Sequence, residues 1–290
     1  MEASEILLRN KRRVRRKQFL IYSVKYFFMV ILAVFLLFPF LFMVSKSLMN
    51  ITDANSVHPK LFPSQIRLEN YLIFFDYTQY FLNSLIIVVI NGVFIPLTGM
   101  MVAYPFARYN FKGKKIMFSV MMSTVLLPGS VLMVPTYIMY SFFGLVDKVA
   151  SQWIGAFWGG GAINIFLFIQ FMRGFPRDYD DAARIDGANK ADIFFKIMVP
   201  MCMNVIVFIG VGTIIGRWSD FQGPLIYLTS QSKFTIAVAF YYDFSSSGTS
   251  ALLPHYRMAM AVCMTILPMV LFMCFQKMMI GGVQIGGIKG

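Results

Sequence analysis

The segment DYDDAARIDGANKADIFFKIMVP, residues 178–200, is a polar island between two long apolar runs. Four of its first nine residues are aspartates, a glycine at position 187 divides it, and a proline at position 200 closes it. Its charged side chains need water, whereas the runs on either side need an apolar environment. The segment therefore predicts a solvated helical loop between two helices that lie in a different medium.

The composition identifies that medium as a membrane. Of the 290 residues, 58% are hydrophobic and 13% are charged, whereas a soluble domain has about 45–50% apolar and about 25% charged residues. A helix needs about 20 residues to cross the hydrocarbon core. Charge-free windows that fit this length are found at 26–45, within 77–107, within 116–146, and at 149–172, 197–216 and 258–276. We therefore expect an all-α integral membrane protein with six transmembrane helices. The run 234–242 is too short to cross and is expected to be re-entrant or interfacial.

The basic residues predict the orientation. The N-terminal stretch RNKRRVRRK, the loops 108–115 and 173–196 and the C-terminal tail hold 18 Lys and Arg, whereas the loops of the opposite face hold seven. Short loops rich in Lys and Arg stay in the cytoplasm. We expect a basic cytoplasmic N-terminus at 1–25, a six-span domain at 26–280 with a cytoplasmic loop 173–200 between helices 4 and 5, and a cytoplasmic tail at 281–290.

The same distribution disfavours nucleic acid as a partner. The net charge of +13 is explained as a topology signal and as a contact for the anionic headgroups of membrane lipid. The first apolar run is 20 residues long and no small-x-small cleavage site follows it. It is therefore expected to be a retained anchor.

The absence of acidic residues and histidines from the spans limits the possible functions. Asp, Glu and His are absent from all six windows, which disfavours a proton- or sodium-driven carrier because such carriers bury ionisable groups. Neutral polar residues such as Asn83 and Asn164 remain in the spans. They either join helices by hydrogen bonds or line a path for an uncharged, hydroxyl-rich solute. No phosphate-binding P-loop is present, so the energy for transport has to come from another subunit.

A metal-dependent enzyme is disfavoured by the spacing of the aspartates in 178–200. Asp178 and Asp181 would share a helical face, but the next position on that face is Ile185, which cannot bind a metal. The arrangement fits a docking element better. Ala182 and Ala183 let another surface approach the backbone, and a glycine at 187 can end one short helix so that a second starts at an angle. We predict no catalytic residue and no metal site.

This docking element resembles the EAA loop of permease subunits of ABC importers, whose pattern is E-A-A-x3-G-x9-I-x-L-P. The matching residues are Asp181, Ala182, Ala183, Gly187, Ile197, Val199 and Pro200. Asp181 replaces the usual Glu and Val199 replaces the usual Leu. The stretches YFLNSLII (80–87), PTYIMYSFFGLVD (135–147), RWSDFQGPLIYLT (217–229) and GGVQIGGIKG (281–290) resemble the MalG-like subunits of carbohydrate importers.

The resemblance implies a function and a set of partners. The chain would be a permease of the bacterial inner membrane that takes a sugar or oligosaccharide from an extracytoplasmic solute-binding protein. It would pair with a second, different permease and with two ATPase subunits that bind ATP and Mg, so that it needs no cofactor of its own. The alternatives are a permease for another solute, such as a polyol phosphate, and a secondary carrier.

The resemblance also implies site residues. The residues expected to contact the ATPase are Asp181, Ala182, Ala183, Arg184, Asp186, Gly187, Ile197 and Pro200. The translocation path or gate would include Asn83, Asn164, Arg217, Trp218 and Asp220. Arg217 and Asp220 are three residues apart and would share one face if their helix continues. The external segment 217–257 is rich in aromatic residues and is expected to contact the binding protein.

Overall fold

The computed structural model describes residues 2–245 and 253–284, and every regular element in that part is a helix. The chain divides into two compact units. Unit 1 comprises Met1–Ile73 and Leu253–Val262, and unit 2 comprises Phe74–Leu252 and Cys263–Gly290. Each unit is described by itself.

Unit 1 begins with α1 (Glu2–Ser47), which holds the expected N-terminal segment 1–25 and the expected first span in one helix. The short α2 (Ile51–Ala54) and most of η1 (Leu68–Tyr77) follow, together with the start of α13 (Pro254–Gln284). The loop after α1 is held by the buried carboxylate of Asp53, which accepts hydrogen bonds from Lys60 Nζ at 2.5 Å and Ser64 N at 2.9 Å. This loop is therefore folded and not a free linker.

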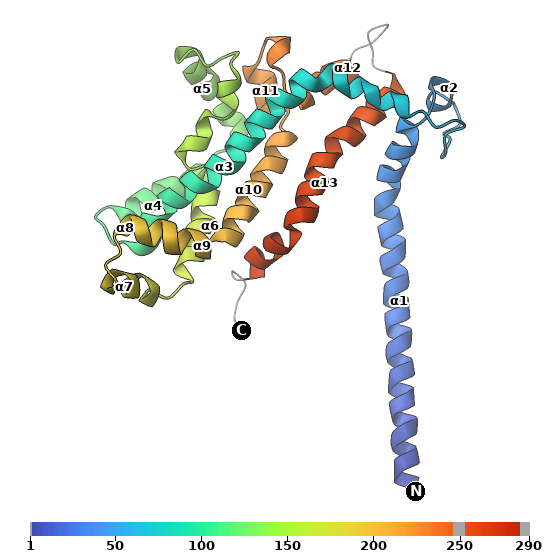
Figure 1. Ribbon diagram of the computed structural model, residues 1–290, viewed down its shortest axis with the longest axis horizontal. Helices are drawn as coiled ribbons and strands as arrows, with labels where there is room; N and C mark the ends of the chain where they lie inside the picture. Colours follow the sequence, from blue (N-terminus) through green and yellow to red (C-terminus); the bar gives the residue numbers. More distant parts are fainter. Residues whose placement is uncertain (1, 246–252, 285–290) are drawn as a thin grey trace. The chain divides into compact units, whose positions relative to one another are not determined.

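Unit 2 contains most of the helices (Figure 1). In chain order they are α3 (Thr78–Arg108), α4 (Lys114–Ser123), η2 (Thr124–Leu126), α5 (Gly129–Phe142), η3 (Val149–Gln152), η4 (Ile154–Trp158), α6 (Ala162–Arg173), α7 (Asp178–Ile185), α8 (Lys190–Asp192), the π-helical η5 (Ile193–Met198), α9 (Val199–Met201), α10 (Met203–Trp218), α11 (Gln222–Tyr227), η6 (Gln231–Lys233), α12 (Ile236–Ser245) and the rest of α13.

The helix α3 is the centre of unit 2 and packs against both α6 and α10. Its contact with α10 is close because two glycines face each other there. A Cβ on Gly210 would lie 3.0 Å from the carbonyl oxygen of Gly92. Small residues allow such close approach between helices in membranes, where van der Waals packing and not hydrophobic burial drives association.

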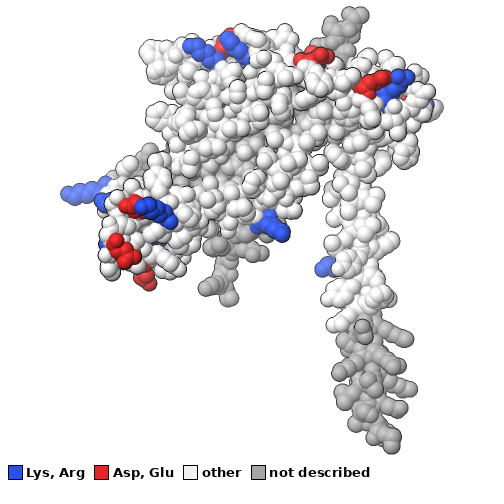
Figure 2. All heavy atoms as spheres, in the orientation of Figure 1, with Lys and Arg blue, Asp and Glu red and all other residues white. Residues whose placement is uncertain are grey.

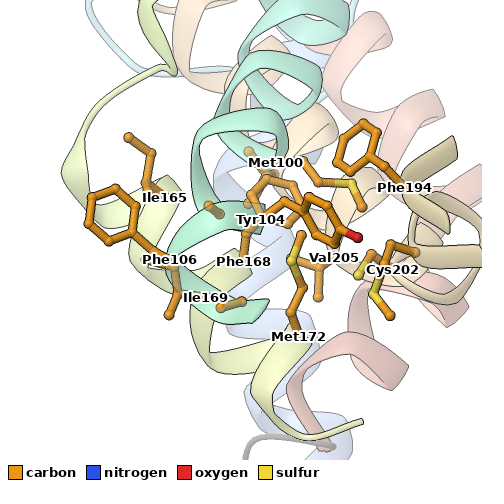
Figure 3. Packing of buried hydrophobic residues seen from close by; sticks show 14 of the residues in the cluster. Met100, Tyr104, Phe106, Ile165, Phe168, Ile169, Met172, Phe194, Cys202 and Val205 are labelled. Carbon is orange, nitrogen blue, oxygen red and sulfur yellow. The ribbon is translucent and has the colours of Figure 1, made fainter. Parts of the chain in front are cut away.

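Toward the end of α3 that carries Arg108, the core becomes continuous with loop 173–200. Met100 and Tyr104 of α3 pack with Phe168 and Met172 of α6, as Figure 3 shows. Phe194, Cys202 and Val205 close this core from the other side. The loop is therefore anchored in the helical core, although its other face is exposed.

The predicted spans are largely recovered, but two of them are not straight. Four helical stretches are long and apolar enough to cross a membrane: Gln18–Ser47, Leu68–Arg108, Val149–Arg173 and Pro254–Met279. The expected spans within 116–146 and at 197–216 are helix pairs that bend by 105° and 72°. The bends lie at Pro128 and next to Pro200, because proline lacks the donor for a continuous helix. The six expected spans exist only if each bent pair counts as one.

Two further segments bear on the expectations. Most of the short run 234–242 lies in the ten-residue α12, which begins at Ile236 and is too short to cross. The helix α13 continues through Gln284 into the expected tail 281–290, whose last residues, 285–290, lie outside the described part.

Charged side chains in unit 2 gather at its two ends (Figure 2). One group surrounds α7 and α8, and another lies at the opposite end, near α11. The surface between them, on the face shown, is almost free of charge. This distribution is typical of a protein whose two ends meet water and whose waist meets lipid.

Candidate functional site

The loop 173–200 folds into two short helices that meet at a glycine, as predicted. The helix α7 carries Asp178, Asp180 and Asp181 in its first turn, where negative charge is favourable because the amide groups there point outward. Gly187 follows with φ at +82°, a conformation that costs a glycine little. Asn189 then caps α8 and forms a capping box with Asp192.

The two alanines of the motif face opposite sides. Ala183 is buried and belongs to the core that includes Phe194 and Met198, whereas Ala182 is exposed. The core of the chain therefore covers most of Ala183, which reaches the outside only as part of the lining of a groove. Ala182 offers its small side chain to the outside.

Two grooves flank α7. One, of about 550 Å³, is lined by Pro176, Asp178, Tyr179, Ala182, Ala183, Asp186 and Ile197. The other, of about 400 Å³, is lined by Ala183, Asp186, Gly187, Ala188, Asp192, Lys196 and Ile197. Both grooves share Ala183, Asp186 and Ile197 in their lining. Ile185, at the end of α7, lines neither groove and is 87% exposed. Open grooves on the same loop as an exposed apolar side chain can receive a matching surface.

The remaining predicted residues of this loop lie on its accessible surface. Arg184 Nη1 is 3.1 Å from Asp181 Oδ1, and both side chains are more than half exposed. Asp186 and Pro200 are exposed, and Ile197 is half-buried. The structure thus brings all eight expected residues into one segment, of which Ala183 alone is buried.

Sequence analysis missed the acidic residue that anchors this loop. The buried acid is Asp180 and not its neighbour Asp181, and its Oδ2 lies 3.3 Å from Nε of Arg108 at the end of α3. In the sequence, Arg108 stands out only as one of the basic residues that predict orientation. The available signal was helical spacing, because Asp180 lies three residues before Ala183 and shares its inward face.

At the opposite end of unit 2 the predicted pair forms, although the helix does not continue. The helix α10 ends at Trp218, yet Arg217 Nη1 lies 3.3 Å from Asp220 Oδ2. The other carboxylate oxygen of Asp220 accepts a hydrogen bond from Gly223 N at 3.2 Å, in the first turn of α11. The pair therefore joins α10 to α11.

Trp218 is buried beside this pair. Its indole Nε1 donates a hydrogen bond to Met264 O at 2.9 Å, and its ring meets Phe81 edge-on at 5.6 Å. These contacts tie α10 to α13 and α3.

The two asparagines expected along a path make contacts within the chain. Asn83 is buried, and its Nδ2 donates to the carbonyl oxygens of Ser232 and Phe234 at 2.9 and 3.0 Å. Asn164 Nδ2 donates to Gly160 O at 2.8 Å, within its own segment. These contacts favour the first of the two interpretations, in which the amides hold segments together.

The loops at this end are tied by Asp147, which has a φ of +56°. Its carboxylate accepts hydrogen bonds from Ser230 N at 2.8 Å, Ser230 Oγ at 2.6 Å and Lys233 Nζ at 2.7 Å. The hydrogen bond from Lys233 and those from Ser230 hold the pKa of this carboxyl well below its usual value. Residues 246–252 of the expected external segment lie outside the described residues.

Comparison with known proteins gives the setting for this geometry. Residues 95–283 match the family described as "Binding-protein-dependent transport system inner membrane component". The chain is 30% identical over 271 residues to the inner membrane ABC transporter permease protein YcjP of Escherichia coli strain K12, with 89% of this chain and 94% of that protein covered. It is 32% identical over 238 residues to the arabinooligosaccharides transport system permease protein AraQ of Halalkalibacterium halodurans, with 79% and 81% covered.

A solved structure shares the fold. A chain of a bacterial ABC transporter involved in the import of the acidic polysaccharide alginate superimposes with a TM-score of 0.80 at 19% identity, over 89% of this chain and 96% of that one. Permeases of this kind are transport components without catalytic activity, and the ATPase is a separate subunit. The chain belongs to the family of inner membrane components of binding-protein-dependent transport systems, as a permease subunit of an ABC importer.

Proposed function

We propose that this permease carries a neutral sugar or oligosaccharide delivered by an extracytoplasmic binding protein. Relatives named for arabinooligosaccharides, for melibiose, raffinose and stachyose, and for multiple sugars support this substrate class. The charge-free windows fit a solute without charge, because a charged one would need countercharges along its path. The same observation argues against a polyol phosphate and against a secondary carrier.

Loop 173–200 is the surface that the ATPase binds, and this assignment depends above all on one observation. A segment with many charges presents an exposed apolar tip at Ile185, held out by the turn at Gly187. Contiguous exposed apolar surface marks contact sites, and Ile185 shares α7 with Tyr179 and Ala182, which line the larger groove. The contact residues are Asp181, Ala182, Arg184, Asp186, Gly187, Ile197 and Pro200, and Ala183 supports them from inside.

Two ATPase subunits, which bind the ATP and Mg, would move this loop and its counterpart on a second, different permease. Alternating access by rigid-body movement of packed helices then follows. The cytoplasmic side holds both termini and loop 173–200, as the excess of Lys and Arg indicates. The opposite end, with Arg217, Trp218 and Asp220, faces the binding protein and forms part of the gate.

The test is uptake by the complete complex in proteoliposomes, with tritiated raffinose and tritiated arabinotriose as the two probes. We expect uptake that requires ATP and the binding protein and that is indifferent to an uncoupler. Uptake that survives removal of ATP and collapses with an uncoupler would show a secondary carrier instead. ATP-driven uptake of neither sugar by a complex with stimulated ATPase would reject the substrate class alone.

A further inference from the structure

One ion pair is unlike all others among the described residues, because both of its side chains are more than nine-tenths buried. Arg108 is the last residue of α3 and Asp180 lies in the first turn of α7. Their side chains are 3% and 7% exposed, and Nε of the first lies 3.3 Å from Oδ2 of the second. The pair joins the central helix of unit 2 to loop 173–200.

The guanidinium holds more than one part of that loop. Arg108 Nη1 donates a hydrogen bond to Phe175 O at 3.1 Å, just before α7. Its Nη2 lies 3.7 Å from Sδ of Met198, at the end of η5. A planar group with several donors in fixed directions can fix the relative positions of three segments. Arg108 thus contacts the loop before, within and after its two short helices.

Stability does not account for the pair. Arg108 Nε and Asp180 Oδ1 are buried without a hydrogen-bond partner in the described part of the chain. A buried ion pair with unsatisfied atoms is often no more stable than apolar side chains of the same size. Separating the two charges, however, would leave each one alone in an apolar core, which is strongly unfavourable. Such a pair adds little to folding but resists being pulled apart.

We propose that Arg108 and Asp180 are positioning residues that make α3 and loop 173–200 move as one body, so that a force on the loop reaches the helices. The inference rests on the proposed docking of the ATPase at this loop. From α3 the movement passes to α10 at the close contact of Gly92 and Gly210, where the backbones leave little room to slide. Without the pair, the ATPase would move the loop while α3 stays behind.

Two measurements on the complete complex test this. In the first, spin labels at Arg177→Cys, an exposed position just before α7 that lines neither groove, and at Val93→Cys on α3 report the distance between loop and helix. The background has the three native cysteines replaced by Ala. It is measured without nucleotide and with ATP and Mg. We expect one distance in both states for the parent, and a distance that changes with ATP in Asp180→Asn, because a neutral amide cannot hold the buried cation.

In the second, uptake of the two labelled sugars is divided by the ATP hydrolysed. We expect Asp180→Asn to lower this ratio about tenfold, a coupling loss of the usual size for linked sites, while ATPase activity persists. A role in folding alone would lower the yield of complex and leave the ratio unchanged. Asp76→Asn, an exposed acid far along the chain from the loop, is the matched control and should keep both readouts.

If Asp180→Asn does not assemble, Arg108→Lys decides, since lysine keeps the buried charge but cannot reach Asp180, Phe175 and Met198 together. It should assemble and show the same change in the label distance. Unchanged label distances together with an unchanged uptake ratio in an assembled variant would overturn the proposal. Normal ATPase binding and uptake in a well-inserted Ala182→Trp variant would instead reject the docking assignment.

Discussion

Individual residues of loop 173–200 show what a motif can and cannot specify. Its spacing indicated the segment that we propose as the contact with the ATPase, and the glycine turn at 187 has the predicted conformation. The spacing did not tell Asp180 from Asp181, or Ala182 from Ala183, because adjacent residues differ by about 100° around a helix. Which of them faces inward depends on how α7 lies against α3, and that is set by tertiary packing.

Ala182→Trp is predicted to block docking of the ATPase without harming the fold. Ala182 is exposed and lines the larger groove beside α7, so an indole there would occupy the space of a partner and would not enter the core. Co-purification of the ATPase with the permease measures the effect, and Ala182→Ser, which keeps the site small, should retain docking. A well-inserted Ala182→Trp variant with normal ATPase binding and uptake would show that this face is not the contact.

Asp147 is predicted to give the loops at the other end a pH-dependent stability. Its pKa is lowered by Lys233 and Ser230, so the folded state prefers the charged form. The stabilisation is complete above the ordinary aspartate pKa of about 4, and it is lost as pH falls from there toward the lowered value. Acid is therefore expected to destabilise these loops.

The measurement is the melting temperature of the purified protein compared with Asp147→Asn between pH 7 and pH 3. The difference should be constant from pH 7 to about 5 and shrink below pH 4. Lys233→Met removes the largest cause of the lowered pKa. The difference in melting temperature between the parent and Lys233→Met should therefore also shrink below pH 4. A difference between parent and Asp147→Asn that does not vary with pH would contradict the assignment.

Among the helices, the sequence did not show which spans are bent. Hydropathy windows count residues and charges but carry no direction, so 116–146 and 197–216 were expected as simple spans. The bends lie at Pro128 and shortly after Pro200, and hydropathy does not reveal them because proline is tolerated within apolar spans. The length of α12, by contrast, was predictable, because a short apolar run cannot span a bilayer in any packing.

The contact between α3 and α10 supplies a prediction at this level. Gly210→Val is expected to lower stability by about 1–3 kcal/mol, the usual cost of overpacking, because a Cβ there meets the backbone of Gly92 at 3.0 Å. Gly212→Val is the matched control on the same helix, since a Cβ at 212 meets nothing within 4 Å. Thermal unfolding in detergent compares the two variants. Equal melting temperatures for both would show that the helices do not depend on this close approach.

For the whole transporter, the question is how the two ends of unit 2 communicate. The end with loop 173–200 is built around one buried ion pair. The opposite end is built from partly exposed ones, Arg217 with Asp220 and Lys233 with Asp147. Exposed pairs are weak and can break and re-form at little cost. In the proposed mechanism, these weak contacts lie at the gate and the firm contact lies where the ATPase acts on the permease.

Asp220→Asn is therefore predicted to reduce the stimulation of ATPase activity by the liganded binding protein, with assembly unchanged. An amide keeps the oxygen that accepts from Gly223 N but loses the attraction to Arg217, so only the charge is tested. The loss should be about two- to fivefold, equivalent to the ~1 kcal/mol or less of a partly exposed ion pair. The ATPase rate of the reconstituted complex, with and without liganded binding protein, gives the ratio. Glu69→Gln, which breaks the exposed pair of Arg67 and Glu69, is the control and should leave the ratio alone. An unchanged ratio in Asp220→Asn would mean that the bond between α10 and α11 does not distinguish the open gate from the closed one.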